Sequence, residues 1–447
     1  MLFETNRSYL ASLPRFAQDP AQFQTLLTTE AFRLKLLDLI SKAQTRIYIT
    51  TLYLQEDEAG AQILAALYAA RARCPDLDIR VFVDWHRAQR GLIGAGSQAG
   101  NAAWYQRERL KHDLNVPIYG VPAQTRELFG VLHLKGFIFD DTVVYSGASL
   151  NNVYLHVGER YRYDRYHVIN NSALADSMVN FLQTEFLNSS AVYRLDLDPI
   201  PSTKQISPDI RQFRQRLKSA NYATHHAQDE VSGLGITPIV GVGKRNPLNR
   251  LIIKLLASAK QHVQICTPYF NLPRTVIKEI NRLLQRGVKV DIIVGEKKAN
   301  DFYIPENEPF KTIGALPYLY ETHLRRFAKV HQLDIHRGQL NLMLWNDPGH
   351  SYHLKGIWVD DDYILLTGNN LNPRAFSLDV ENALLIHDPK HELTAQLQQE
   401  KAEIAKNTTR IAYYRELETV LDYPLPVKKL LTRLSRFRAD RLISRLL

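Results

Sequence analysis

A His–Leu–Lys–Gly sequence occurs twice in this chain, and in both copies the seventh residue after the histidine is an aspartate. Residues two apart in a strand point to the same side, so each histidine projects beside its lysine. An imidazole can attack or protonate a phosphate ester, and an ammonium group neutralises phosphate oxygens. The aspartates have the opposite parity and precede a turn, which indicates a backbone role. The copies are His133, Lys135 and Asp140, and His353, Lys355 and Asp360.

A single copy of this pattern would be better explained as a strand with a solvent-facing histidine and lysine. The second copy favours a catalytic interpretation, because it stands at the equivalent place of an internal repeat. Two lobes related by a pseudo-two-fold axis would bring both His–Lys pairs to one site, with a nucleophile, a general acid/base and two cations. No Cys/His or carboxylate cluster in the sequence has metal-site spacing, so we expect neither a metal nor another cofactor.

The internal repeat has a constant offset of 216 residues in its first part, where Ala43 matches Ala259 and Tyr53 matches Tyr269. Residues 40–54 and 256–270 each pass from a helical pattern into an alternating strand. A second helix (61–73; 275–286) and a second strand follow in both halves before the motif. Strands alternating with helices predict parallel α/β units. The alternative, one α/β domain with accidental similarity, does not explain why helix, strand and motif recur in the same order.

The repeat also divides the chain. We expect a first lobe at residues 1–198, a second lobe at 248–423 and a C-terminal segment at 424–447. The stretch 199–247 contains Pro- and Gly-rich sequences and is predicted to connect the lobes, with a short basic helix around 210–217. A length of 447 residues fits two domain cores.

Composition limits the class of protein. No apolar run approaches the roughly 18 residues of a membrane span, and the N-terminus lacks a signal-peptide pattern. The two cysteines form no disulfide framework, so we expect a cytoplasmic protein. The net charge of +10 is concentrated after Val427, where seven residues are basic and one is acidic. A nuclease would spread its basic surface around a groove, so this distribution argues against a nucleic-acid partner.

With these motifs in place, the chain resembles the phospholipase D superfamily over most of its length. A closer resemblance is to the bacterial CDP-diacylglycerol–serine O-phosphatidyltransferases of that superfamily. The segments that carry it include "VDWHRAQRG", "YGVPAQTRELFGVLHLKGF", "GASLNNVYLH", "CTPYFNLP", "IGALPYLYE" and "TGNNLNPRAF". The resemblance implies an α/β fold of two similar lobes, each a mixed, mostly parallel sheet flanked by helices, with one active site between them.

The resemblance implies a reaction of CDP-diacylglycerol with L-serine that gives phosphatidylserine and CMP through a phosphatidyl-histidine. It implies that His133, in the first motif, is the nucleophile and His353 the general acid/base, although nothing local separates them. It also implies that Glu381 orients His133 and that Asp164 orients His353. Cardiolipin synthase, phospholipase D and, with less support, nuclease remain alternatives, because they would share these catalytic residues.

Further substrate contacts are implied around the motifs. Asn151 and Asn372, in elements that resemble the family's Gly–Ser–x–Asn sequence but carry one extra residue, would hold phosphate oxygens with the lysines. Arg87 and Arg90 follow the second strand of the first lobe, where α/β sites form, and would bind the CDP pyrophosphate or belong to a surface loop. Tyr269 and Asn271 follow the first strand of the second lobe and would line the same cleft. The alternative for Tyr269 is an aromatic residue of the core.

The C-terminal segment suggests a membrane partner. Residues 427–437 have the pattern of an amphipathic helix, with Val427, Leu430, Leu431, Leu434 and Phe437 on one face and basic residues opposite. We expect residues 427–447 to dock the enzyme on the anionic inner face of the cytoplasmic membrane. The alternative is a basic helix packed on its own lobe or on a dimer partner. The sequence leaves open the oligomeric state, a homodimer included, and the residues that select serine.

Overall fold

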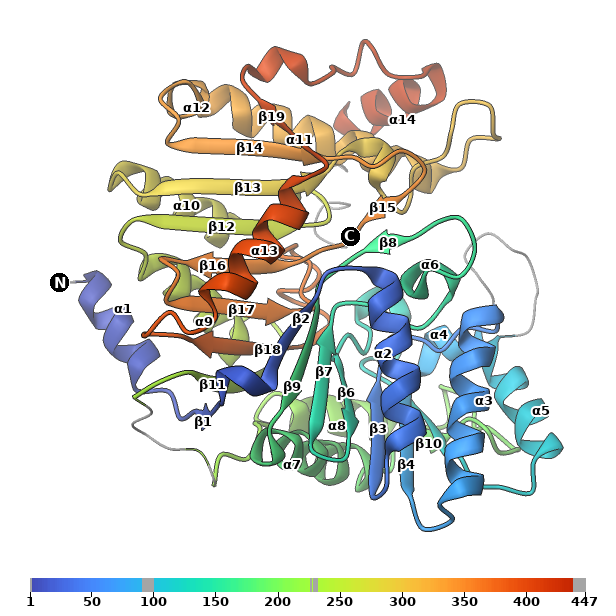
Figure 1. Cartoon of the computed structure of the whole chain (residues 1–447). Helices are drawn as coiled ribbons and strands as arrows, with labels where there is room; N and C mark the ends of the chain where they lie inside the picture. The colour runs from blue at the N-terminus through green and yellow to red at the C-terminus, as the bar shows by residue number, and fades with distance from the viewer. Residues whose placement is uncertain (1, 91–99, 226, 228–231, 437–447) are drawn as a thin grey trace.

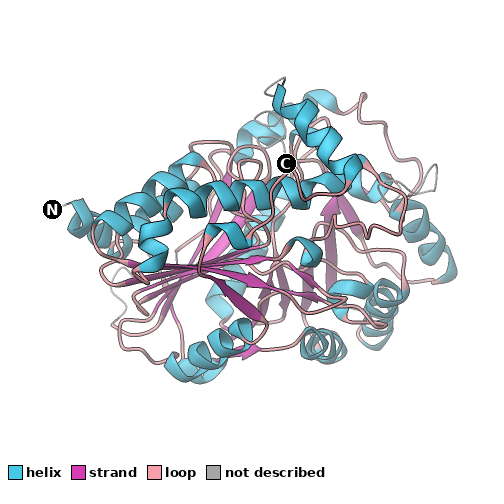
Figure 2. Ribbon diagram, turned by 90° about the horizontal axis from the view of Figure 1, so that it is seen from above, coloured by secondary structure: helices cyan, strands magenta, loops and turns pink. Residues whose placement is uncertain are grey.

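The computed structural model describes residues 2–90, 100–225, 227 and 232–436. It contains two large mixed β-sheets, one in each half of the molecule, with helices on both sides of them (Figures 1 and 2). The first sheet has the order β10 (Tyr193–Arg194), β5 (Ile118–Val121), β4 (Asp78–Asp84), β3 (Arg46–Thr50), β6 (Gly136–Phe139), β7 (Thr142–Ser146), β9 (Tyr166–Asn170) and β2 (Phe23–Leu26).

The second sheet repeats this arrangement with a longer edge. Its order is β1 (Phe16–Ala17), β11 (Gly235–Val242), β18 (Val380–His387), β17 (Tyr363–Thr367), β16 (Gly356–Val359), β12 (His262–Thr267), β13 (Lys289–Gly295), β14 (Leu340–Trp345) and β19 (Thr408–Ile411). A short parallel pair, β8 (Arg162–Tyr163) with β15 (Ser351–Tyr352), joins the two halves of the chain.

Helices connect the strands of each half. In the first half they are α2 (Thr29–Lys42), α3 (Glu58–Arg73), α4 (Trp85–Gln89), α5 (Asn101–Lys111), α6 (Asn152–Leu155), α7 (Ser172–Phe181), the π-helical η3 (Leu182–Leu187) and α8 (Ser207–Leu217). In the second half they are α9 (Pro247–Ala257), α10 (Arg274–Gln285), α11 (Leu316–Val330), α12 (Gln332–His336), α13 (Thr394–Ala405) and α14 (Leu425–Arg436). Short 3₁₀ turns are η1 (Pro20–Gln22), η2 (Glu127–Phe129), η4 (Lys297–Ala299), η5 (Thr312–Ala315) and η6 (Tyr414–Glu416).

The two-lobe α/β fold was predicted, but the sheets are not mostly parallel. Among the described strands of the two large sheets, parallel pairing occurs where a helix returns the chain, between β3, β4 and β5 and between β12, β13 and β14. The other described pairings of these two sheets are antiparallel. The physical reason is the motif itself, because the chain turns directly at Asp140 and Asp360 and the next strand runs back along the motif strand.

Two segments lie elsewhere than the expected boundaries suggest. The stretch 199–247 contains the basic helix α8, as predicted, but also β11, which is a full strand of the second sheet. At the other end of the chain, α1 (Leu2–Ala11) packs beside α9, and β1 pairs with β11 (Figure 1). Leu10 is buried in the core of the second half, which explains why the N-terminal segment crosses to it.

The lobes share one core. The largest cluster of buried side chains contains the interior of the first lobe together with one face of the second sheet, including Trp345, Trp358 and Leu384. The other face of the second sheet packs against α9 and α10 in a separate cluster. The relative position of the lobes is therefore fixed by buried apolar surface, which a site assembled from both lobes requires.

Helix α14 corrects part of the prediction for the C-terminal segment. Val427 and Leu431 are 3% and 6% exposed and pack on α11, with Leu430 and Leu434 against the same cluster. The apolar stripe therefore faces its own lobe, because the aromatic surface of α11 offers it a place to be buried. Phe437 and residues 438–447 lie outside the described residues. Within the described chain, no helix combines the length and hydropathy needed to cross a bilayer.

Candidate active site

Each motif histidine lies where the backbone of one lobe pairs with that of the other. The His133 N–H donates to the Val380 carbonyl oxygen at 2.9 Å, and the His353 N–H donates to the Tyr163 carbonyl oxygen at 2.8 Å. Each of these carbonyls belongs to the residue just before the predicted acidic partner. The same backbone hydrogen bond between lobes thus occurs twice, and it brings both motifs to the junction of the lobes.

The imidazoles contact the carboxylates of the opposite lobe, in the crossed pairing that was predicted. His133 Nδ1 lies 2.9 Å and 3.0 Å from the two carboxylate oxygens of Glu381. His353 Nδ1 lies 3.1 Å from Asp164 Oδ2. A carboxylate at Nδ1 favours the tautomer whose Nε2 lone pair is free to act as nucleophile or base.

The two lysines cross over in the same way. Lys135 lies against Gly368 and Lys355 lies against Gly147, so closely that a Cβ at either glycine would come within 2.8 Å of the lysine side chain. The absence of a side chain at these glycines makes room for the cations. Lys135 Nζ donates to Ser149 Oγ at 3.3 Å, and Lys355 Nζ donates to Asp164 Oδ2 at 2.9 Å.

Burial sets the protonation of the site. It lowers the pKa of His133 and of His353, and the neighbouring lysine ammonium groups lower the pKa of both further. Burial together with the charge of Lys355 lowers the pKa of Lys135 to about 7. Burial also lowers the pKa of Lys355, against the opposing effect of Asp164. Neutral imidazoles suit nucleophilic attack, and an anionic phosphodiester beside these groups would raise all four pKa values.

The motif aspartates are remote from the imidazoles. Asp140 and Asp360 follow β6 and β16, whereas the histidines and lysines precede these strands, so the strand length separates them. Both aspartates adopt positive φ angles, 51° and 53°. Their carboxylates accept hydrogen bonds from the N–H groups of Gln44, Thr45 and Arg46, and of Lys260, Gln261 and His262, respectively. They fix the start of β3 and β12, a backbone role.

The motif asparagines cap helical turns. Asn151 Oδ1 accepts from the Tyr154 N–H at 3.0 Å, and Asn372 Oδ1 accepts from the Ala375 N–H at 2.8 Å. Both side chains therefore use their carbonyl oxygen to shape the turn that follows the motif. An asparagine can donate to a phosphate only through its amide hydrogens.

The two arginines predicted for the pyrophosphate share one carboxylate. Arg90 Nη2 donates to Glu127 Oε1 at 2.6 Å, and Arg87 Nη1 lies 3.6 Å from the same oxygen. The Arg87 guanidinium also lies 5.2 Å from the ring centre of Tyr53, in the segment that follows β3. The carboxylate compensates their charge, so phosphate binding by this pair would have to compete with Glu127.

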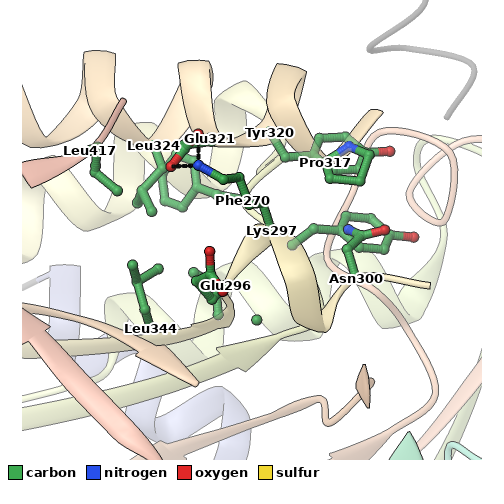
Figure 3. A pocket seen from close by; sticks show the side chains of 13 residues that line it. Phe270, Glu296, Lys297, Asn300, Pro317, Tyr320, Glu321, Leu324, Leu344 and Leu417 are labelled. Atoms are coloured by element: carbon green, nitrogen blue, oxygen red, sulfur yellow. Dashed lines mark hydrogen bonds and ion pairs between the residues drawn. The ribbon is translucent and has the colours of Figure 1, made fainter. Parts of the chain in front are cut away.

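Tyr269 and Asn271 lie after β12, as predicted; Asn271 is buried and Tyr269 is half-buried. Tyr269 stacks on Tyr320 of α11 with ring centres 4.5 Å apart, and its hydroxyl accepts from Asn370 Nδ2 at 3.2 Å. Tyr269 also lines a small pocket under α11, whose polar lining includes the Lys297–Glu321 ion pair (Figure 3). Tyr269 thus contacts both this pocket and Asn370, in the segment before Asn372.

Sequence reasoning missed three residues around His353. The Tyr154 hydroxyl lies 2.9 Å from His353 Nδ1 and 3.3 Å from its Nε2. The Arg162 guanidinium covers the ring of Tyr154 at 4.7 Å, and Arg162 Nε lies 2.9 Å from Asp301 Oδ1. Counted from the motif asparagines, the residue equivalent to Tyr154 in the second lobe is Ala375, so the repeat carried no signal for this tyrosine.

Comparison with known proteins agrees with this geometry. The family model described as "Cardiolipin synthase, PLD-like domain" matches residues 36–184 and 252–404. The chain is 51% identical to the CDP-diacylglycerol–serine O-phosphatidyltransferase of Escherichia coli (strain K12), covering 99% of this chain and 98% of that protein. It is 50% identical to the enzyme of the same name from Haemophilus influenzae, over 98% and 97% of the two chains.

A solved structure shows the same fold. The crystal structure of phosphatidylserine synthase from Haemophilus influenzae Rd KW20 matches with a TM-score of 0.96, at 48% sequence identity and with 100% of both chains covered. The paired motifs, the crossed lysines and these matches agree with one another. The chain therefore belongs to the phospholipase D-like family and, within it, to the CDP-diacylglycerol–serine O-phosphatidyltransferases.

Proposed function

We propose that this enzyme transfers the phosphatidyl group of CDP-diacylglycerol to L-serine, giving phosphatidylserine and CMP. The observation that carries the proposal is the site between the lobes, where two buried His–Lys pairs each meet a carboxylate of the opposite lobe. It occurs in a chain that is 51% and 50% identical to two transferases of this name, nearly end to end.

In the first step, His133 Nε2 attacks the phosphorus attached to diacylglycerol, and the bond to the CMP oxygen breaks. His353 donates the proton that the departing CMP oxygen takes up. Lys135 and Lys355, with the amide hydrogens of Asn151 and Asn372, hold the non-bridging oxygens as negative charge develops. The two lysine cations supply the charge stabilisation, so activity should survive exhaustive chelation of divalent metals.

In the second step, His353 removes the proton of the serine hydroxyl, which attacks the phosphatidyl-histidine. The phosphorus–nitrogen bond breaks, and its electron pair returns to His133. Water can take the place of serine, so slow formation of phosphatidic acid is an expected side reaction.

The experiment that tests this function is CMP release from CDP-diacylglycerol, measured with and without L-serine. Release that depends on serine, together with labelled phosphatidylserine as product, is the expected result. Transfer to phosphatidylglycerol in preference to serine, or cleavage of DNA, would replace the proposal with one of its alternatives.

The substrates also indicate where the enzyme works. CDP-diacylglycerol is anionic and resides in a membrane, whereas serine and CMP are water-soluble. We propose reversible attachment to the anionic inner face of the cytoplasmic membrane through residues 427–447, of which Lys429 and Arg433 are exposed on α14. Because the apolar stripe of α14 is buried, the attachment of this helix is electrostatic.

A further inference from the structure

An ion pair beside His353 has no part in the steps described above. Arg162, on β8 of the first lobe, and Asp301, after η4 of the second lobe, place Nε and Oδ1 2.9 Å apart. Their side chains are 17% and 18% exposed, so the pair is largely but not fully removed from solvent. It belongs to neither of the two histidine–carboxylate contacts.

The pair lies on the side of the site that would activate the acceptor. Tyr154 lies between this ion pair and His353. The Arg162 guanidinium is 4.7 Å from the centre of the Tyr154 ring, and the Tyr154 hydroxyl is 3.3 Å from His353 Nε2. Asp301 raises and Arg162 lowers the pKa of His353, after burial and Lys355, so both charges act on the imidazole.

Asp301 has an acceptor position to spare. Arg162 Nε donates its hydrogen to Ser351 Oγ, at 3.2 Å, and not to the nearby carboxylate. Asp301 Oδ1 is buried and accepts no hydrogen bond from the described residues. The Arg162 guanidinium faces this oxygen as an ion pair, but a buried carboxylate oxygen that accepts no hydrogen bond is uncommon in folded proteins. A ligand with an ammonium group would provide the missing donor.

We propose that Arg162 and Asp301 form the acceptor subsite, in which the serine carboxylate binds Arg162 and the serine ammonium binds Asp301. This inference rests on the proposed function and names the residues that select the acceptor. The serine hydroxyl then meets His353 Nε2, gives it its proton and forms a bond to phosphorus, while the bond from phosphorus to His133 breaks.

The charges of the site fit this assignment. Lys135 and Lys355 serve the phosphate, and Asp164 and Glu381 hold the histidines. A zwitterion needs one further cation and one further anion, close together, which is what this pair provides. Water and glycerol carry no charge and would gain nothing from it, so the subsite favours serine over both.

The competing explanation is that the ion pair has a structural role and holds the two lobes together. Arg162 also donates to Ser351 Oγ, and its ion pair with Asp301 joins the two lobes. The two explanations differ in acceptor selectivity. The test therefore uses L-serine, ethanolamine, which has the ammonium but no carboxylate, and 3-hydroxypropanoate, which has the carboxylate but no ammonium. Exchange of labelled CMP into CDP-diacylglycerol without any acceptor reports the donor half-reaction separately.

The variants are Arg162→Gln and Asp301→Asn in the full-length enzyme, with Arg162→Lys and Asp301→Glu as conservative forms. The matched controls are Arg160→Gln and Glu308→Gln, which neutralise exposed residues close in sequence to Arg162 and Asp301. We expect the serine KM to rise by about 10- to 100-fold in Arg162→Gln and Asp301→Asn, which is the range for loss of one charge-assisted contact. The rate of CMP exchange should fall by a much smaller factor.

Each variant should lose a different acceptor preference. The preference for serine over ethanolamine should fall in Arg162→Gln, and the preference for serine over 3-hydroxypropanoate should fall in Asp301→Asn. Arg162→Lys and Asp301→Glu should recover part of the serine affinity. An unchanged serine KM, or a parallel loss of transfer and exchange with all acceptor preferences intact, would overturn the subsite. Wild-type enzyme that exchanges CMP but ignores serine would instead overturn the proposed function.

Discussion

The two catalytic histidines have different surroundings although their motifs repeat. His133 Nδ1 faces both oxygens of Glu381, whereas His353 Nδ1 contacts both Asp164 and the Tyr154 hydroxyl. Lys355 Nζ also contacts His353 Nδ1 directly. Three polar groups around one imidazole suit a residue that gains and loses a proton in turn. A simple carboxylate pair suits the nucleophile.

The first prediction follows from this difference. In a His353→Ala enzyme, no base remains to deprotonate serine, so a lipid-phosphate adduct should persist on His133 after exposure to CDP-diacylglycerol. Labelled lipid that stays with the denatured protein, mapped to a peptide containing residue 133, is the measurement. His133→Ala serves as the control and should carry no label. An adduct on His353 in that control would invert the two roles.

The second prediction concerns pH. Burial and Lys355 lower the pKa of Lys135 to about 7, so its ammonium form is present below this pH and is lost above it. Because the ammonium binds phosphate, kcat/KM for CDP-diacylglycerol should fall as pH rises through about 7, while bound substrate moves the limb of kcat to higher pH. Lys135→Arg keeps its charge and should lose this alkaline limb if it retains activity. A wild-type kcat/KM that is flat from pH 6 to 9 would contradict this assignment.

At the scale of elements, helix α13 fastens the two lobes together. It lies beside β2 at the junction in Figure 1 and inserts Glu400 into the first lobe. The Glu400 carboxylate accepts from Arg165 Nε at 2.7 Å and from Arg165 Nη2 at 2.8 Å, and it lies 3.3 Å from His167 Nε2. Arg165 in turn stacks 4.0 Å over Trp358 of β16. The residue next to Asp164 is thus anchored by the second lobe.

The third prediction is the cost of removing this anchor. Glu400→Gln leaves the Arg165 cation buried without a counter-charge and should lower the free energy of unfolding by about 3–5 kcal/mol. Although burial opposes it, Arg165 and His167 lower the pKa of Glu400 to about 2. The carboxylate therefore stabilises the fold above its ordinary pKa, near 4.5, and this stabilisation is lost as pH falls towards 2.

Denaturant unfolding at several pH values measures both effects. The matched control is Glu403→Gln on the same helix, whose carboxylate lies 3.7 Å from Lys406 and belongs to the surface. It should change stability by no more than about 1 kcal/mol. Equal stability of the Glu400 and Glu403 variants at neutral pH would show that the Glu400 contact contributes nothing to the junction.

The sequence was sufficient to predict the features that occur in both halves of the repeat. Strand and helix periodicity predicted both lobes, and the family resemblance, applied to the aligned halves, predicted that His133 would meet Glu381 and His353 would meet Asp164. It failed where local turns decide, because short connections made the sheets more antiparallel than the helical crossovers suggested. It was silent on Tyr154 and His353, which are 199 residues apart in the chain and have no counterpart in the repeat.

At the scale of the whole molecule, charge and apolar surface are separated on α14. Its apolar residues Val427, Leu430, Leu431 and Leu434 complete a cluster with α11, while Lys429 and Arg433 are exposed. A helix held in this way presents cations to a surface without inserting side chains into it. Attachment should therefore be reversible and should weaken with salt, because the Debye length falls from about 10 Å at 0.1 M to about 3 Å at 1 M.

The fourth prediction tests this attachment by co-sedimentation with anionic vesicles over a salt series. Lys429→Gln with Arg433→Gln, and separately a chain ending at Arg436, should bind less at low salt, since each basic residue near an anionic surface contributes about 1 kcal/mol. Both variants keep Val427 and Leu431, so the cluster with α11 stays covered. The control is Arg274→Gln with Lys278→Gln, an equally spaced pair of exposed cations on α10. Equal loss in the α10 control would attribute binding to net charge alone. Salt-insensitive binding by every form would rule out an electrostatic C-terminal attachment.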